Sequence, residues 1–263
     1  MSNNIYLKKG LDLPIAGEAV QQTKKVIVPD IVAVKPTDFR GLVPKLLVRE
    51  GDKVLAGTPV LADKMSQNIL FASPVSGTVV EVVRGEKRKL LEVRIKADAN
   101  QEYVDFGVKK ASSLTAAQVK ESLLAAGLWP AITQRPYGII ADPETTPKAI
   151  FVSAFSTAPL AANVEYALNG QLDNIQAAVD ALGKIAKVHV CVNAANESAT
   201  LFGKLQNVTL HTVSGKHPAG NVGVQIHHIA PIQKGEIVWT VSAVMLAAIG
   251  KLFNTGKYDV RRK

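Results

Sequence analysis

The hydrophobic pattern of the chain changes once along its length, and this change limits the fold more than any other feature. Between about residues 26 and 96, short apolar runs alternate with turn residues, a spacing that is typical of an all-β unit. From residue 148 onward, strand patterns alternate with helix patterns, which indicates an α/β layer with a mainly parallel sheet. We therefore predict a two-domain α+β protein, with a β-rich domain at 1–105 and an α/β domain at 148–260.

A helix and a proline-rich stretch lie between these two patterns, at 106–147. Thr115 and Gln118 have the spacing of a capping box, so the sequence predicts a helix that begins there and ends near Gly127. The stretch 128–147 carries four prolines, which favour extended backbone in the residues that precede them. We therefore predict a helix followed by a loop or linker that connects the two domains.

The composition is that of a chain that folds around its own core. Hydrophobic residues make up 47% of the 263 residues, and Cys191 is the single cysteine. One cysteine excludes an intrachain disulfide and argues against a cysteine-ligated zinc or iron–sulfur site. The longest apolar run, 237–250, is shorter than the about 20 residues that cross a bilayer, so we expect a buried strand and then a helix. The N-terminal residues are not followed by the apolar stretch of a secretory signal peptide. We therefore expect a soluble, cytoplasmic protein.

The positive net charge does not by itself indicate a nucleic-acid partner. Lys and Arg exceed Asp and Glu by 31 − 22 = 9. The basic residues occur in small groups without the interleaved aromatic residues of a stacking platform, and no zinc-finger, helix-turn-helix or RNP pattern is visible. We therefore expect no nucleic-acid partner, and a basic nucleic-acid-binding protein stays open as a further alternative that a salt-dependent gel shift would reveal.

One hairpin unit in the first half has a recognisable order of glycines and apolar residues. Its glycines, Gly51, Gly57 and Gly77, have a spacing that resembles that of biotinyl/lipoyl carrier domains. In those domains two such halves form a flattened barrel, and a lysine at a hairpin tip carries the cofactor. Lys64 lies near that tip, but the turn at 62–67 matches the carrier pattern only partly. We expect an unmodified lysine on a shared scaffold, and a biotin- or lipoyl-carrier protein is the alternative function.

Three separated segments together resemble one family. They are KGLDLPI at 9–15, SPVSGT at 73–78 followed by RGEKR at 84–88, and HPAG at 217–220 followed by IHH at 226–228 and AIGKLF at 248–253. The combination is similar to the NqrA subunits of the sodium-translocating NADH:quinone oxidoreductases, from residue 9 to about residue 257. The RnfC subunits of the related Rnf electron-transport complexes share the first β-domain, but they carry cysteine-ligated iron–sulfur clusters that one cysteine cannot provide.

The resemblance implies both a fold and a role. The fold is a biotinyl/lipoyl-like barrel-sandwich hybrid followed by a Rossmann-like α/β domain that resembles the flavin-binding domain of complex I. The role is that of a peripheral subunit on the cytoplasmic side of the bacterial inner membrane, in a six-subunit complex that passes electrons from NADH to ubiquinone or menaquinone and exports sodium. The family's flavins and iron centres lie in partner subunits, and NqrA is implicated in quinone binding. Family members are considerably longer at the C-terminus, so we assign no function of that further region to this chain.

The α/β half lacks the usual fingerprints of nucleotide binding and covalent catalysis. It has no G-x-G-x-x-G, no P-loop and no G-x-S-x-G elbow. We therefore predict that the chain holds no redox cofactor and that it does not oxidise NADH by itself.

One loop is a candidate for contact with a quinone. Lys216, His217 and Gly220 follow the strand predicted at 208–213, and loops at the carboxyl ends of such strands face the ligand crevice of an α/β sheet. Lys216 and His217 can donate hydrogen bonds to a carbonyl oxygen of a quinone head group. We predict a quinone site formed by these residues together with His228, and a structural loop with a capping histidine is the alternative.

Other conspicuous side chains are expected to be structural. His189 and Cys191 are two residues apart on a predicted strand and therefore share one face of it. We expect a buried cysteine beside a hydrogen-bonded histidine rather than a metal pair, and we predict no metal site. Trp129 and Phe155 lie near the connector, where we expect core packing.

Overall fold

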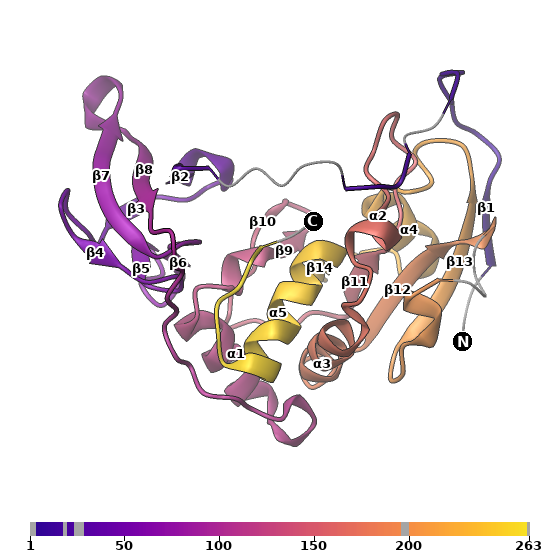
Figure 1. The fold of residues 1–263 in the computed structure, drawn as a ribbon. Coiled ribbons are helices and arrows are strands. Elements are labelled where there is room, and N and C mark those ends of the chain that lie inside the picture. Colours follow the sequence, from indigo (N-terminus) through magenta and orange to yellow (C-terminus); the bar gives the residue numbers. More distant parts are fainter. Residues whose placement is uncertain (1–3, 18–19, 24–28, 196–199, 262–263) are drawn as a thin grey trace.

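The computed structural model describes residues 4–17, 20–23, 29–195 and 200–261. These residues form two halves that lie side by side, a small antiparallel β unit and a larger α/β unit (Figure 1). Both halves match the predicted two-domain α+β fold.

The barrel half consists of a four-stranded sheet of order β2-β8-β7-β4 and a three-stranded sheet of order β3-β5-β6, with antiparallel pairing throughout. In β8, Val93 and Ile95 are buried at alternate positions, which is the pattern of a strand with one face in a core. The strands are β2 (Ile31–Val34), β3 (Pro44–Leu46), β4 (Lys53–Val54), β5 (Pro59–Asp63), β6 (Leu70–Ala72), β7 (Gly77–Arg84) and β8 (Leu90–Ala97).

A seven-stranded sheet of order β1-β13-β12-β11-β14-β9-β10 forms the centre of the α/β half. Strands β1, β13, β12, β11 and β14 run parallel, whereas β9 pairs antiparallel with both β14 and β10. Strands β12 and β14 are buried along nearly their whole length, as expected for parallel strands that are covered on both faces. The bounds are β1 (Asn4–Leu7), β9 (Ile132–Arg135), β10 (Ile139–Ile140), β11 (Ile150–Ser153), β12 (Val188–Asn193), β13 (Thr209–Gly215) and β14 (Val238–Val241).

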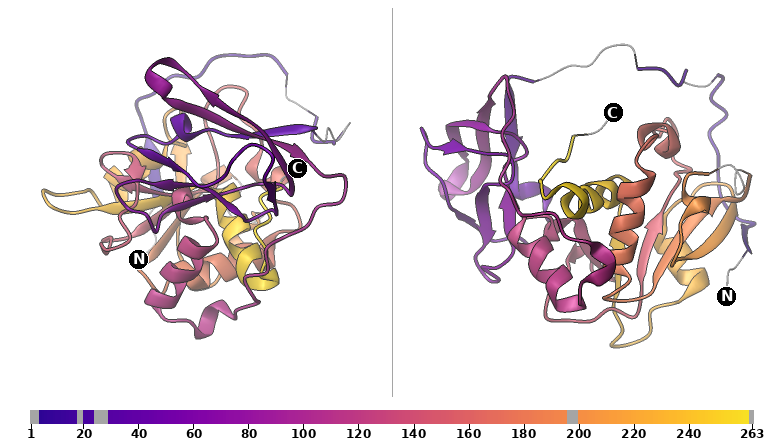
Figure 2. Two further views of the ribbon diagram at one scale, coloured as in Figure 1. Left: turned by 90° about the vertical axis from the view of Figure 1, so that its left-hand side faces the viewer. Right: turned by 60° about the horizontal axis from the view of Figure 1, so that its bottom comes forward.

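The helices pack against this sheet and against each other. Helices α3 and α5 lie side by side, and α1 lies between the barrel half and α3 (Figure 2). A Cβ atom at Gly250 of α5 would lie 1.6 Å from the carbonyl oxygen of Asn174 in α3, so the two helices can approach this closely only at a glycine. In the described ranges, no helix is long and apolar enough to cross a bilayer. The α-helices are α1 (Ala116–Ala125), α2 (Val164–Ala167), α3 (Leu172–Leu182), α4 (Val222–Ile229) and α5 (Ala243–Thr255), and the 3-10 segments are η1 (Pro36–Asp38), η2 (Glu86–Arg88), η3 (Ala111–Ser113), η4 (Trp129–Ala131) and η6 (Phe202–Lys204).

The predicted capping box is present at the start of α1. The Thr115 hydroxyl oxygen accepts a hydrogen bond from the backbone N–H of Gln118, and the Gln118 side-chain oxygen accepts one from the backbone N–H of Thr115. The helix ends before Gly127, which has the left-handed φ of +69° that favours glycine after a helix.

The proline-rich stretch 128–147 is not the loop or linker that we predicted. It contains β9 and β10, which extend the large sheet beyond β14. The four prolines lie before, between and after these two strands, so none of them interrupts the hydrogen bonds of a ladder. The prolines mark the turns around the two strands and do not prevent the strands from pairing with β14.

Strand β1 and two further predicted elements also differ from the prediction or fall outside the described residues. Strand β1 joins the large sheet beside β13, although we expected the first 105 residues to form one β-rich domain. The β-rich pattern that begins near residue 26 includes a predicted strand at 26–28, which lies outside the described residues. The alternating pattern from residue 148 onward includes a predicted helix at 197–205, which lies partly outside them, and its described part contains the 3-10 segment η6.

The two halves meet along a seam that involves chain segments distant in sequence. A Cβ atom at Gly127 would lie 2.8 Å from the Cβ atom of Ala72 in β6, so the end of α1 packs directly on the barrel. The segment that leaves the barrel also contacts the segment after α5, because the Phe106 amide donates to the Gly256 carbonyl over 2.8 Å. These contacts hold the last described residues against both halves.

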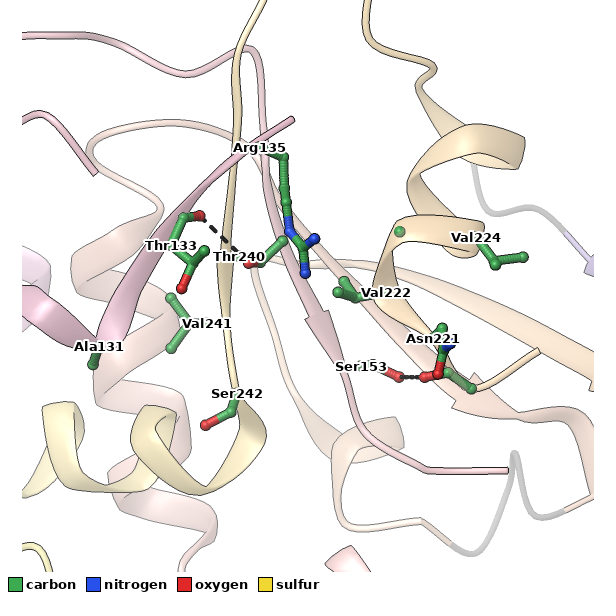
Figure 3. A pocket seen from close by; sticks show the side chains of 12 residues that line it. Ala131, Thr133, Arg135, Ser153, Asn221, Val222, Val224, Thr240, Val241 and Ser242 are labelled. Carbon is green, nitrogen blue, oxygen red and sulfur yellow. Dashed lines mark hydrogen bonds between the residues drawn. The ribbon is translucent and has the colours of Figure 1, made fainter. Parts of the chain in front are cut away.

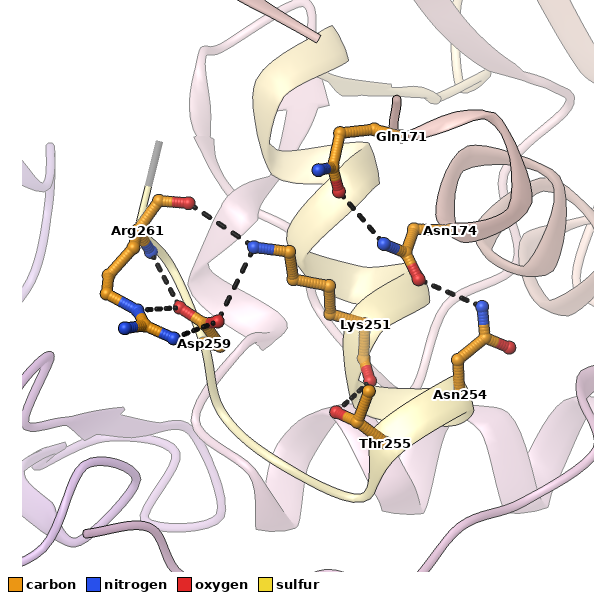
Figure 4. A network of polar contacts seen from close by, with 7 residues as sticks. All are labelled: Gln171, Asn174, Lys251, Asn254, Thr255, Asp259 and Arg261. Carbon is orange, nitrogen blue, oxygen red and sulfur yellow. Dashed lines mark hydrogen bonds and ion pairs between the residues drawn. The ribbon is translucent and has the colours of Figure 1, made fainter. Parts of the chain in front are cut away.

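A polar network fixes this last segment (Figure 4). Asp259 accepts hydrogen bonds from Arg261 and lies 3.5 Å from the Lys251 ammonium of α5. Burial alone would raise the pKa of Asp259, but the hydrogen bonds from Arg261 and the charge of Lys251 lower it below its ordinary value. The carboxylate therefore stays ionised and keeps the segment attached to α5.

Candidate functional site

A polar cavity of about 690 Å³ opens at the carboxyl ends of β11 and β14 (Figure 3). The order of strands reverses at this place, since β12 and β13 follow on one side of β11 while β14 lies on the other. Ligands of open α/β sheets bind at such reversal points. The cavity is lined by Ala131, Thr133, Arg135, Ser153, Gly220, Asn221, Val222, Gly223, Val224, Thr240, Val241 and Ser242.

The polar side chains of this cavity come from several elements. Ser153, at the end of β11, donates to the carbonyl of Gly220 over 3.0 Å and thereby ties the strand to the loop before α4. Arg135, at the end of β9, points toward the first turn of α4 (Figure 3). The Nε atom of Arg135 is buried and has no hydrogen-bond partner among the described residues.

A second, apolar cavity of about 380 Å³ lies in the seam between the two halves. Phe39 and Phe71 form its barrel wall, with ring centroids 4.7 Å apart in an edge-to-face arrangement. Leu128 and Met245 contribute the opposite wall from the α/β half. Ala131 lines both this cavity and the polar one, so the two lie next to each other. The remaining lining residues are Ala33, Val34, Lys35, Asp38, Ala72, Pro74, Gly127, Pro130 and Tyr258.

Few polar groups border the apolar cavity. Lys35 and Asp38 are exposed residues on its barrel side. Tyr258 is 9% exposed, and within the described part of the chain its hydroxyl makes no hydrogen bond. Burial raises the pKa of Tyr258 to about 12, so at neutral pH the hydroxyl keeps its proton and remains a donor. An apolar pocket with one or a few polar groups is the usual form of a site for a small organic ligand.

The structure brings together only part of the predicted quinone site. Gly220 lines the polar cavity, while Lys216 is exposed on the loop beside it. The His217 ring lies 3.1 Å from the Thr157 hydroxyl. His228 lies in the last turn of α4 and is exposed, at the end of the helix away from the cavity. That this set of residues contacts a quinone stays a prediction.

The N-terminal segment covers the backbone of the predicted loop. The Leu11 amide donates to the His217 carbonyl over 3.0 Å, and the His217 amide donates to an Asp12 carboxylate oxygen over 3.1 Å. The motif at 9–15 and the motif at 217–220, which are far apart in the sequence, are therefore neighbours in space.

His189 and Cys191 are both buried, and His189 makes a hydrogen bond, as the sequence predicts. His189 Nδ1 lies 2.8 Å from His211 Nε2, and the His189 ring stacks on Phe151 at a centroid distance of 4.7 Å. Burial and the neighbouring His211 lower the pKa of His189 to about 4, and burial also lowers the pKa of His211 to about 4. Burial raises the pKa of Cys191 to about 12, so its thiol is not a reactive nucleophile.

The other residues singled out in the sequence lie either on the surface or in the core. Lys64 and Met65 are exposed at the tip of the β5–β6 hairpin, as the sequence predicts. Trp129 is fully buried and packs edge-to-face on Trp239, which confirms its role in the core. In the described ranges, no three His, Cys, Asp or Glu side chains gather as metal ligands do.

The chain thus joins a small antiparallel β unit to an α/β layer, with one cavity at the strand reversal and one at the seam. This is the two-domain architecture that the sequence motifs lead us to expect. Family models agree with this: residues 5–98 match the NqrA N-terminal barrel-sandwich hybrid domain, and residues 114–258 match the NqrA second alpha/beta domain. The chain belongs to the NqrA family.

Curated relatives give the same result, and each is the A component of a Na(+)-translocating NADH-quinone reductase. The chain is 38% identical to the relative from Pseudomonas aeruginosa over 261 residues, and 38% identical to that of Serratia proteamaculans over 266 residues. The relative from Marinomonas is 35% identical over 260 residues. The alignments cover 97–98% of this chain but 58% of each relative, so the chain spans little more than half the length of these proteins.

Proposed function

We propose that the chain forms the barrel and α/β part of the NqrA component in a Na⁺-translocating NADH:quinone reductase. In this role it is a peripheral subunit on the cytoplasmic side of a bacterial inner membrane, and partner subunits carry the flavins and iron centres. The match of both halves to the NqrA domains supports this assignment, as do the names of its relatives. On this proposal the isolated chain does not oxidise NADH, and NADH-dependent turnover by the chain alone would contradict it.

We further propose that the chain contacts the head group of ubiquinone or menaquinone in the apolar cavity of the seam. This cavity replaces the loop with Lys216 and His217 as our proposed quinone site, because neither of these residues lines either cavity. The observation that carries this proposal is the chemistry of the cavity wall, in which Phe39, Phe71 and Met245 surround a nearly nonpolar space. A quinone head group is flat and largely apolar, and its oxygen atoms accept hydrogen bonds but donate none. Tyr258 lines this cavity, and its hydroxyl, which is protonated at neutral pH as in any tyrosine, is the matching donor.

Quenching of tryptophan fluorescence by a short-chain, water-soluble ubiquinone tests the proposal. Trp129 is a suitable reporter because it is buried and directly precedes Pro130, a residue of the cavity wall. We expect saturable quenching by the wild-type chain. Tyr258→Phe should weaken binding about fivefold, since it removes one hydrogen bond worth about 1 kcal/mol.

Tyr137→Phe is the matched control, because Tyr137 is 67% exposed and lies outside both cavities. It should bind quinone as the wild type does. Quenching that does not saturate, or equal affinities for the wild type and Tyr258→Phe, would contradict the proposed site.

A further inference from the structure

Among the described residues, the lining of the polar cavity carries a positive charge and no negative one. In the part of the chain that the structure describes, the lining contains one charged residue, Arg135, and no Asp or Glu. In the ranges that the structure describes, none of the ion pairs includes Arg135. Its Nε atom is buried without a hydrogen-bond partner, and a buried donor left unpaired costs free energy. The guanidinium therefore has unused capacity to bind an acceptor.

The first turn of α4 supplies further donors on the opposite wall. Asn221 precedes the helix, and its side chain makes no capping hydrogen bond. The amides of Val222 and Gly223 donate to no carbonyl in the described chain, as is usual for the first turn of a helix. A Cβ atom at Gly223 would meet nothing within 4 Å, so this side of the turn is open.

Figure 3 shows the Arg135 side chain pointing toward the first turn of α4, where these amides lie. We propose that the cavity binds a phosphate group, with the Arg135 guanidinium on one side and the α4 amides on the other. A tetrahedral oxyanion presents oxygens in several directions, so it can accept from both walls at once. Guanidinium groups and helix N-termini are the two donors that phosphate uses most readily in proteins.

The size of the cavity indicates the kind of molecule. At about 690 Å³ it falls in the range of pockets for small organic ligands, roughly 300–1,000 Å³, and is much larger than orthophosphate alone. Thr133, Thr240 and Ser242 also line the cavity. The Thr240 hydroxyl donates to the Thr133 carbonyl and the Ser242 hydroxyl caps α5, but each oxygen can still take part in a hydrogen bond with the polar remainder of an organic phosphate. The proposal is independent of quinone binding, which concerns the neighbouring apolar cavity.

Calorimetric titration at constant ionic strength tests the phosphate site, first with inorganic phosphate and then with glycerol 3-phosphate. We expect Arg135→Gln to weaken binding by about tenfold or more, because a charge-assisted, two-pronged contact is lost. Arg49→Gln is the matched control: it removes the same charge from an exposed turn of the barrel and should leave the affinity unchanged.

Val222→Pro tests the other wall and still applies if Arg135→Gln does not fold. Val222 is the first residue of α4, where proline is well tolerated, and the substitution removes one amide donor without breaking the helix. We expect a loss of affinity of about threefold. Binding of glycerol 3-phosphate but not of inorganic phosphate would support an organic ligand, and binding of both would support the phosphate site itself. No binding of either probe, or equal affinity in wild type and Arg135→Gln, would overturn the proposal.

Discussion

The two halves of the molecule differ in how deeply their side chains are buried. Among the described residues, Leu61 and Ile95 are the two of the twelve largest fully buried side chains that belong to the barrel strands, and the α/β half and its connector supply the other ten. Both tryptophans and all five histidines also lie beyond residue 128. The barrel therefore contributes few of the largest buried side chains, and its apolar residues are continuous across the seam with the core of the α/β half.

This difference bears directly on the two cavities. The polar cavity is built almost wholly from elements of the α/β half, so the well-packed sheet determines its geometry. The apolar cavity takes one wall from each half, so its shape depends on how the barrel sits on the α/β layer. Changes in the α/β half should thus affect the whole protein, whereas changes at the seam should affect mainly the barrel and the apolar cavity.

The largest effect is expected where α3 and α5 touch. Gly250→Ala places a Cβ atom against the Asn174 carbonyl, and the helices must separate to relieve the clash, at a cost of about 3 kcal/mol of unfolding free energy. Urea denaturation followed by tryptophan fluorescence measures this change. Gly223→Ala in α4 is the control, because its Cβ would meet nothing, and it should be neutral or stabilise by up to about 1 kcal/mol. Equal stability of the two variants would contradict the close helix contact.

The next effect is a loss of stability in acid that originates in the α/β half. The pKa values of His189 and His211 are lowered to about 4 in the folded protein by burial, whereas an unfolded histidine titrates near about 6.5. The unfolded chain therefore takes up protons first, so the stability from these groups is complete above about pH 6.5 and is lost as the pH falls toward about 4.

Urea denaturation at several pH values between 4 and 7 measures the slope of the unfolding free energy against pH. His189→Phe, which keeps a ring beside Phe151, should flatten the slope markedly because it removes one of the two groups. His227→Gln should not change it, because His227 is exposed. An unchanged slope in His189→Phe would show that the buried pair does not cause the acid sensitivity.

A smaller effect is expected at the seam. Gly127→Ala combines a left-handed backbone with a Cβ atom 2.8 Å from the Ala72 Cβ. Gly138→Ala has a similar φ of +67° but open space around its Cβ, so it measures the backbone cost alone, about 1 kcal/mol.

We expect Gly127→Ala to destabilise by about 1 kcal/mol more than Gly138→Ala, and to speed hydrogen exchange in β5 and β6 but not in β11 and β12. Uniform acceleration in both halves would contradict a barrel that depends on the seam.

The smallest effect concerns the hairpin lysine, where we expect none. The intact mass of the purified chain should equal the mass of the sequence, since Lys64 is treated as an ordinary exposed residue. Lys64→Arg made in the same host is the control. A mass increase of a biotinyl or lipoyl group in the wild type, absent from Lys64→Arg, would favour the carrier alternative.

Much of the fold could be predicted because it depends on local patterns. Alternation of apolar residues marked β8, and the capping box at Thr115 marked the start of α1. The strands β9 and β10 were missed because their stability comes from pairing with β14, while the local sequence around Pro130 and Pro136 signals turns. Strand β1 was missed for a similar reason, since its partner β13 is about 200 residues away along the chain.

The candidate sites were harder to predict than the fold. The loop with His217 was chosen by its position after a strand, and the sequence offered no sign that residues 11–12 bind its backbone. Arg135 lies in a stretch that we expected to be a linker, so its place in the polar cavity had no local signal. The apolar cavity draws its residues from many separate segments, and only the packing of the two halves brings them together.

Methionine methyl groups can show whether quinone binds at the seam. The chain has three methionines: Met245 lines the apolar cavity, Met65 is 80% exposed at the hairpin tip, and Met1 is the first residue. In a titration of chain labelled with ¹³C-methyl methionine, a short-chain ubiquinone should shift the Met245 resonance in a saturable way and leave that of Met65 unchanged. A saturable shift of Met65 without one of Met245, or no shift at all, would contradict quinone binding at the seam.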